Sequence, residues 1–131
     1  IKFHTWRQIS LLCRLIRTGD ERIGNVALKT IRNFSMKSSI GYVVLLSKDF
    51  LETVDTILSS DCKNSMEKML ILQTLLSIAA TSEQMRSKMK NSSLNRKLKD
   101  QLAALQLTDG EHVQVYNLIT MLSDILYTWS H

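Results

Sequence analysis

The nine residues 27–35, which read ALKTIRNFS, decide the fold because the same pattern returns twice along the chain. A matching segment, ILQTLLSIA, begins 44 residues later at residue 71, and a third, VYNLITMLS, begins after the same interval at residue 115. Apolar residues occupy the first, second, fifth and eighth positions of all three segments, and a small residue closes each one. Spacings of three and four place such residues on one face of a helix. The constant interval therefore predicts three copies of one helical unit.

The same interval relates the segments that lie between these copies. Apolar residues at positions 50, 54 and 58 correspond to apolar residues at 94, 98 and 102, and their spacing of four again favours helix. Proline is absent and only four glycines occur, which suits a chain with few tight turns. We expect no strand, and helices at residues 3–17, 20–36, 38–47, 49–60, 64–80, 82–90, 93–106 and 109–128.

Four capping boxes predict where helices begin. In a capping box, a Thr or Asp side chain accepts a hydrogen bond from the backbone three residues on, and a Glu or Gln at that position reaches back. The boxes pair Thr18 with Glu21, Asp49 with Glu52, Thr81 with Gln84, and Thr108 with Glu111. Each box lies at a boundary that the repeat predicts.

The composition indicates one globular domain, residues 1–131, with an ordinary apolar fraction of 44% and a charged fraction of 22%. The apolar runs are shorter than the roughly 18 residues of a membrane span, so we expect no membrane contact. Cys13 and Cys62 are interpreted as small buried residues in a reducing compartment, which predicts an intracellular protein of the cytoplasm or nucleus. Because the chain begins at Ile1 inside an expected helix, we expect it to be a piece of a longer protein.

The pattern resembles the armadillo repeat, a unit of a short first helix, a second helix and a longer third helix. The third helix of that family typically reads A-L-x-x-L-x-N-L/I-A/S, and residues 27–35 fit it closely. Residues 38–47 resemble the first helix and residues 50–60 the second. The resemblance implies an all-α fold, a right-handed superhelical stack of about three armadillo-type repeats, with approximate repeats at 1–36, 37–80 and 81–131. The related HEAT repeat has nearly the same sequence pattern.

The resemblance also implies a function, because third helices of peptide-binding armadillo proteins line a concave groove. The asparagine of the family pattern holds the backbone of an extended peptide there, and this chain keeps it at Asn33 but has Ser77 and Met121 in the later copies. The tryptophan of some members is replaced by Lys29 and its counterparts. The expected groove residues are Arg22, Lys29, Asn33, Gln73, Ser77 and Asn117. They suit an acidic or polar protein partner, as a peptide or a helix, although Asn33 could instead bond a neighbouring backbone group.

A basic stretch supports an alternative, sequence-nonspecific contact with the phosphate backbone of nucleic acid. Between positions 86 and 99 the chain carries six cations and no aromatic residue, so base stacking is not expected. The net charge of +5 is equally compatible with a solvated basic surface. The basic patch expected under this alternative consists of Arg86, Lys88, Lys90, Arg96, Lys97 and Lys99.

No residue pattern for catalysis is visible. The three histidines, His4, His112 and His131, have no metal-ligand spacing, and no glycine-rich phosphate loop occurs. Most carboxylates fall at expected helix starts, where they cap and complement the helix dipole. We therefore expect a non-enzymatic scaffold with no cofactor and no metal.

Aromatic residues gather near both ends of the chain. Phe3 and Trp6 lie near one end, and Tyr127 and Trp129 near the other. A terminal repeat needs a polar outer face unless something covers it. These residues are interpreted as core, or as surfaces that stack on a further repeat or form a homodimer.

Overall fold

The chain folds as an arrangement of α-helices, which confirms the predicted all-α class. The computed structural model describes residues 2–18, 20–36, 47–59, 65–81, 83–90, 96, 100 and 110–128, and these contain no strand. The helices are α1 (Lys2–Thr18), α2 (Glu21–Ser35), α4 (Lys48–Ser59), α5 (Ser65–Thr81), α6 (Glu83–Lys90) and α8 (Gly110–Thr128). Each lies within two residues of its predicted bounds. The helices expected at 38–47 and 93–106 lie outside the described residues, apart from two isolated helical positions.

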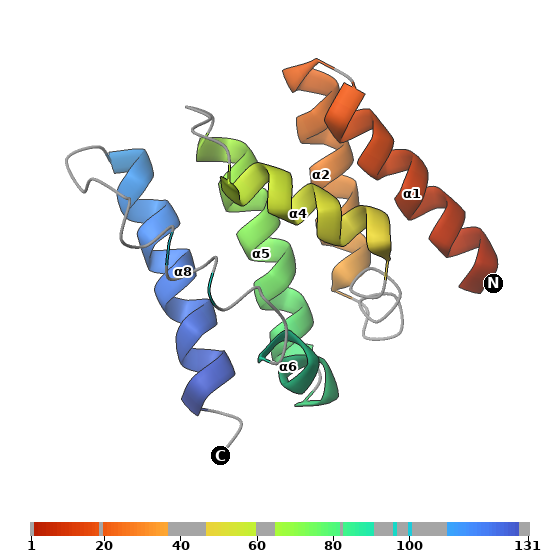
Figure 1. Cartoon of the computed structure of the whole chain (residues 1–131). Helices are drawn as coiled ribbons and strands as arrows, with labels where there is room; N and C mark the ends of the chain where they lie inside the picture. The colour runs from red at the N-terminus through yellow and green to blue at the C-terminus, as the bar shows by residue number, and fades with distance from the viewer. Residues whose placement is uncertain are drawn as a thin grey trace.

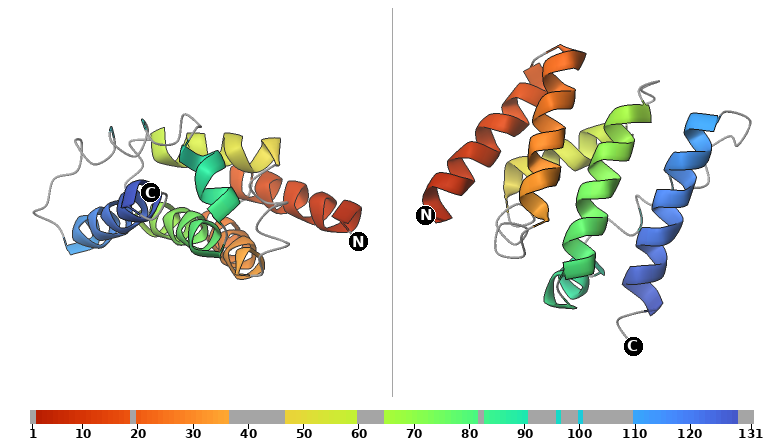
Figure 2. Two further views of the ribbon diagram at one scale, coloured as in Figure 1. Left: turned by 90° about the horizontal axis from the view of Figure 1, so that it is seen from below. Right: turned by 180° about the vertical axis from the view of Figure 1, so that it is seen from behind.

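The three repeat copies form a layer in which α5 lies between α2 and α8 (Figure 1). On one side of this layer lie α1 and α4, which contact each other, and α6 packs on α5 and α8 (Figure 2). Helix α5 therefore has neighbours on several sides, and it is apolar nearly all round, as a buried helix must be. Helix α2 has a single buried stripe and an opposite polar stripe, as a surface helix has.

The core lies between the two layers. Its largest members, Phe50 of α4 and Leu72 of α5, are fully buried together with residues of every helix. The apolar positions of the repeat copies contribute Leu28, Ile31, Ile71, Leu75, Ile78, Ile119 and Leu122. The periodic pattern thus identified core residues correctly, because burial follows helical spacing.

The start of α2 differs from the predicted capping box of Thr18 and Glu21. Thr18 is the last residue of α1, and its Oγ1 donates to the carbonyl oxygen of Arg14 at 2.7 Å. Asp20 caps α2 instead, because its Oδ1 accepts from the backbone N–H of Ile23 at 2.9 Å. The box was wrong because the hydroxyl satisfies a carbonyl of the preceding helix rather than an amide of the next.

The start of α4 also moves by two residues relative to the predicted box. Ser47 precedes the helix, and its Oγ accepts from the backbone N–H of Phe50 at 3.3 Å. Asp49 lies in the first turn and forms an ion pair with Arg17 of α1, as does Glu52, each at 3.4 Å. These pairs are partly exposed and connect α1 to α4, and each stabilises by at most about 1 kcal/mol.

The third predicted box fails for the same reason as the first. Thr81 ends α5, and its Oγ1 donates to the carbonyl oxygen of Ile78 at 3.0 Å, while α6 begins at Glu83. The box of Thr108 and Glu111 includes residues outside the described part of the chain.

Candidate functional site

One face of α2 combines polar and apolar side chains in a regular stripe. Arg22, Val26, Lys29, Asn33 and Met36 follow one another at spacings of four and three, and all are exposed. This stripe is opposite the buried stripe of α2, which faces the second layer of helices. It therefore points away from α1 and α4.

The stripe continues on α5 and α8 at the repeat interval of 44 residues. On α5, Met66 is exposed and Gln73 and Ser77 are half-buried, whereas Leu70, the counterpart of Val26, is buried and interrupts the stripe. On α8, the corresponding Asn117 and Met121 are exposed. We call these three stripes together the outer face; they comprise Arg22, Val26, Lys29, Asn33 and Met36 on α2, Met66, Gln73 and Ser77 on α5, and Gln114, Asn117, Met121 and Asp124 on α8.

All six predicted groove residues belong to the outer face. Because α2, α5 and α8 lie side by side in one layer, the structure brings the six onto adjoining helices (Figure 1). Gln73 is not freely available, since its Oε1 accepts a hydrogen bond from Arg32 Nη1 at 2.8 Å. This hydrogen bond joins α2 to α5.

Sequence reasoning missed the apolar part of this face. Val26, Met36, Met66 and Met121 are exposed by 61%, 64%, 44% and 51%. Exposed apolar side chains that gather on one face commonly mark a protein-contact surface. Methionine in particular adapts to partners of different shape, because its side chain is unbranched and polarisable. Their spacing relative to Asn33 was the signal in the sequence that could have revealed them.

The charges on the outer face are unevenly distributed. Arg22 and Lys29 are exposed on α2, and the half-buried Arg32 lies beside them on the same helix. Asp124 is exposed on the stripe of α8. The α2 side of the face would thus attract negative charge on a partner, and the far end of α8 would attract positive charge.

Glu67 lies at the boundary of α2 and α5, near the buried Gly24. Partial burial raises the pKa of the Glu67 carboxyl, and the nearby carboxylate of Glu21 raises it further. The ionised form is less stable there because it loses hydration and is repelled by a like charge. This carboxylate therefore opposes the packing of the two helices at neutral pH.

The basic stretch does not form a uniform free surface. Arg86 is half-buried, and its Nη1 donates to the carbonyl oxygen of Ala79 at 2.7 Å. It thereby joins α6 to the end of α5, where carbonyl groups lack partners within the helix. Lys88 and Arg96 are exposed and Lys90 is half-buried. Lys97 and Lys99 lie outside the described residues.

Of the cysteines and histidines, the structure describes the side chain of Cys13 alone. Cys13 is free and fully buried between α1 and α4, and burial raises the pKa of its thiol, so little thiolate forms at neutral pH. Cys62 and the side chains of all three histidines lie outside the described part of the chain, as do the side chains of Phe3, Trp6, Tyr127 and Trp129. Among the side chains that the structure describes, no group of three His, Cys, Asp or Glu could hold a metal ion.

Within the described helices, none combines the length and the apolar character that crossing a lipid bilayer demands. Comparisons with protein-family models, with curated proteins and with solved structures found no match to the chain. The geometry of the outer face is therefore the basis for a functional assignment.

Proposed function

We propose that the chain is a non-enzymatic protein-binding scaffold, built as a right-handed superhelical stack of about three armadillo-type repeats. The observation that carries the proposal is the outer face, which crosses three adjoining helices and combines exposed methionines with amide and basic side chains. A surface of this kind recognises a partner through shape and a few polar anchors rather than through chemistry.

Two features support the repeat assignment. The interval of 44 residues that relates residues 27–35, 71–79 and 115–123 also relates α2, α5 and α8 of one layer, so residues 44 apart occupy equivalent positions on neighbouring helices. Leu28, Leu72 and the half-buried Tyr116 occupy one such position on the inner side. A stack of this kind buries a continuous core and leaves a long face for binding.

The chemistry of the outer face favours a polar peptide with acidic residues at one end. Arg22 and Lys29 would pair with carboxylates over α2, and the methionines would cover apolar side chains of the peptide. The side-chain amides of Asn33 and Asn117 each offer two donors and one acceptor oxygen, which suits the backbone of an extended chain. The amide of Gln73 has one acceptor site already occupied by Arg32.

The dimensions of the layer set the length of such a peptide. Packed helices lie about 8–10 Å apart, so the distance from α2 to α8 is about 16–20 Å. An extended strand rises about 3.3 Å per residue, so about six residues cross the face. The proposal needs no cofactor, and the buried thiol of Cys13 suits the reducing interior of the cytoplasm or nucleus.

The test starts from a peptide selected against the folded chain from a random library, with its affinity measured by isothermal titration calorimetry. Replacing Lys29 and Asn33 together by alanine is expected to weaken binding by about tenfold or more, equal to about 1.4 kcal/mol, because two polar contacts are lost. Asn117→Ala is also expected to weaken binding of the peptide, because a polar contact on α8 is lost.

The matched control replaces Lys48 and Thr56 of α4 by alanine. Both residues are exposed, but α4 lies outside the layer of α2, α5 and α8. This variant should bind as the unchanged chain does, and circular dichroism should show that all variants fold. Equal affinity of the outer-face and α4 variants would refute binding at the outer face.

A further inference from the structure

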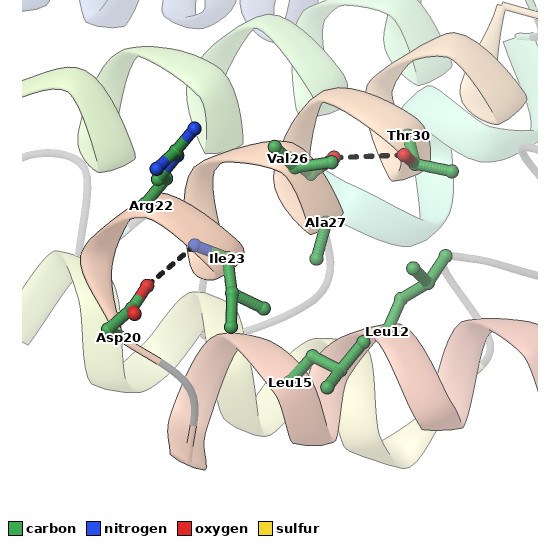
Figure 3. A pocket seen from close by; sticks show the side chains of 8 residues that line it. All are labelled: Leu12, Leu15, Asp20, Arg22, Ile23, Val26, Ala27 and Thr30. Atoms are coloured by element: carbon green, nitrogen blue, oxygen red, sulfur yellow. Dashed lines mark hydrogen bonds between the residues drawn. The ribbon is translucent and has the colours of Figure 1, made fainter.

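A second apolar surface lies at the open edge of the layer, between α1 and α2 (Figure 3). It is a cleft of about 460 Å³ lined by Leu12, Leu15, Asp20, Arg22, Ile23, Val26, Ala27 and Thr30. Ile23 points from α2 toward Leu15 of α1, and Ala27 points toward Leu12, whereas Arg22 points away from α1 (Figure 3). The cleft is therefore apolar at its base, where the two helices meet.

The apolar surface extends beyond the cleft itself. Leu11 and Leu15 of α1 are exposed by 56% and 36%, and Ile23 and Val26 of α2 by 45% and 61%. Isolated exposed apolar residues are ordinary on protein surfaces, but Leu15, Ile23 and Val26 line one cleft. Leu11 lies one helical turn before Leu15 on α1, so the four residues form one patch.

The repeat indicates what shape of partner fits this edge. Helix α5 has helices on both sides, and its residues Leu70, Ile71 and Thr74 are each at most 2% exposed. The equivalent residues of α2, 44 positions earlier, are Val26, Ala27 and Thr30, and two of these remain partly or largely exposed. Positions that a neighbouring helix covers in α5 thus lack such cover in α2, so the vacant surface has the shape that a helix fills.

The charges beside the cleft indicate the chemistry of that helix. On α1, Arg7, Leu11 and Arg14 form an exposed stripe along one border of the patch. On α2, Arg22, Val26 and Lys29 form the matching stripe along the other border. Each stripe places an apolar residue between two cations.

We propose that this edge binds an amphipathic helix of a partner protein whose apolar stripe is flanked by acidic residues. The apolar stripe would fill the cleft over Leu15 and Ile23. The flanking carboxylates would meet Arg14 on one side and Arg22 and Lys29 on the other. A second copy of the chain fits less well, because a two-fold interface would place identical basic stripes against each other. A flat bilayer surface leaves the concave cleft unfilled.

This edge is a different surface from most of the outer face, although Arg22, Val26 and Lys29 border both. The test therefore uses Ile23, which belongs to this edge alone, and a control residue that belongs to neither surface. Ile23→Glu places a charge in the cleft, and Leu51→Glu makes the same kind of change on α4, at a similarly exposed position.

The probe is a designed peptide of about 18 residues, or five helical turns, with leucines at positions spaced by four and three and glutamates on both flanks. A second peptide has lysine at every glutamate. Fluorescence anisotropy of the labelled peptides should show that the acidic peptide binds at least about tenfold more tightly than the basic one, by charge pairing. Ile23→Glu should weaken binding of the acidic peptide at least about tenfold, because a charge would lose its hydration in the cleft, and Leu51→Glu should leave the affinity unchanged.

Three results would overturn the proposal. The first is equal binding of the acidic and basic peptides, and the second is binding that Ile23→Glu does not change. The third is evidence that something else occupies the cleft. Self-association in sedimentation equilibrium that Ile23→Glu abolishes would indicate a second copy of the chain, and binding of the chain to anionic vesicles but not to the peptide would indicate a membrane. Circular dichroism of both variants checks that each is folded. The test of the outer face includes Asn117→Ala on α8, away from the cleft, and uses a different peptide, so either proposal can fail without the other.

Discussion

Two equivalent positions of the repeat, Leu70 and Val26, should respond very differently to the same truncation. They lie 44 residues apart on α5 and α2, but Leu70 is 2% exposed and Val26 is 61% exposed. The difference arises because α5 has helices on both sides, whereas α2 has one open side. Leu70→Ala removes buried methyl groups from a packed boundary, and Val26→Ala removes methyl groups that already contact water.

The expected losses follow from these environments. Leu70→Ala should lower the free energy of unfolding by about 3 kcal/mol, within the range of about 2–5 kcal/mol for buried leucines. That is a large share of the roughly 5–15 kcal/mol that stabilises a typical domain. Val26→Ala should change it by no more than about 0.5 kcal/mol, since a small loss of contact is offset by the higher helix propensity of alanine.

Urea unfolding followed by circular dichroism measures both values. With a slope of about 1–3 kcal/mol per molar urea, Leu70→Ala should lower the midpoint by about 1–3 M, while Val26→Ala should hardly move it. A loss below about 1 kcal/mol for Leu70→Ala would show that α5 is not packed as described. A loss above about 1.5 kcal/mol for Val26→Ala would show that the edge of α2 is covered in solution.

Three further predictions concern single side chains. Glu67→Gln should raise the free energy of unfolding near pH 7, because a raised folded-state pKa means that ionisation of Glu67 opposes folding. The gain should vanish below the ordinary pKa of 4.5 and grow as pH rises, and Glu83→Gln, at an exposed position of α6, should not reproduce it in thermal melts. The Cys13 thiol, tested in a Cys62→Ser background, should react with a thiol reagent only at the rate of unfolding, and rapid labelling of the folded chain would contradict its burial. Arg86→Met should cost about 1–3 kcal/mol in urea unfolding because a carbonyl at the end of α5 loses its donor, and no loss would mean that the bond is not formed in solution.

Helices and core were predictable from the sequence because both depend on local spacing. Leu28 and Leu72 recur at one interval, each with an apolar residue three positions further on, and such positions are buried. Helix starts were less predictable, as Thr18 shows. Its hydroxyl can accept from the next helix or donate to the previous one, and the sequence does not distinguish these choices.

The candidate site was predicted in its polar part only. Asn33 matched a family pattern, whereas the exposure of Met121 depends on which side of α8 its neighbours cover. The bond between Arg32 and Gln73 joins residues 41 positions apart, so no local pattern reveals it. Arg86 was assigned to a basic surface because composition shows charge but not the carbonyl that the side chain meets.

The central claim is that the outer face binds a peptide across α2, α5 and α8. Its most direct test is a map of backbone amide NMR shifts on the labelled chain as a library-selected peptide is added. The shifts are expected to follow the outer stripes, from Lys29 and Asn33 through Ser77 to Asn117, and to spare α4. Shifts confined to α4 and α6, or saturation without change on the three stripes, would contradict the account.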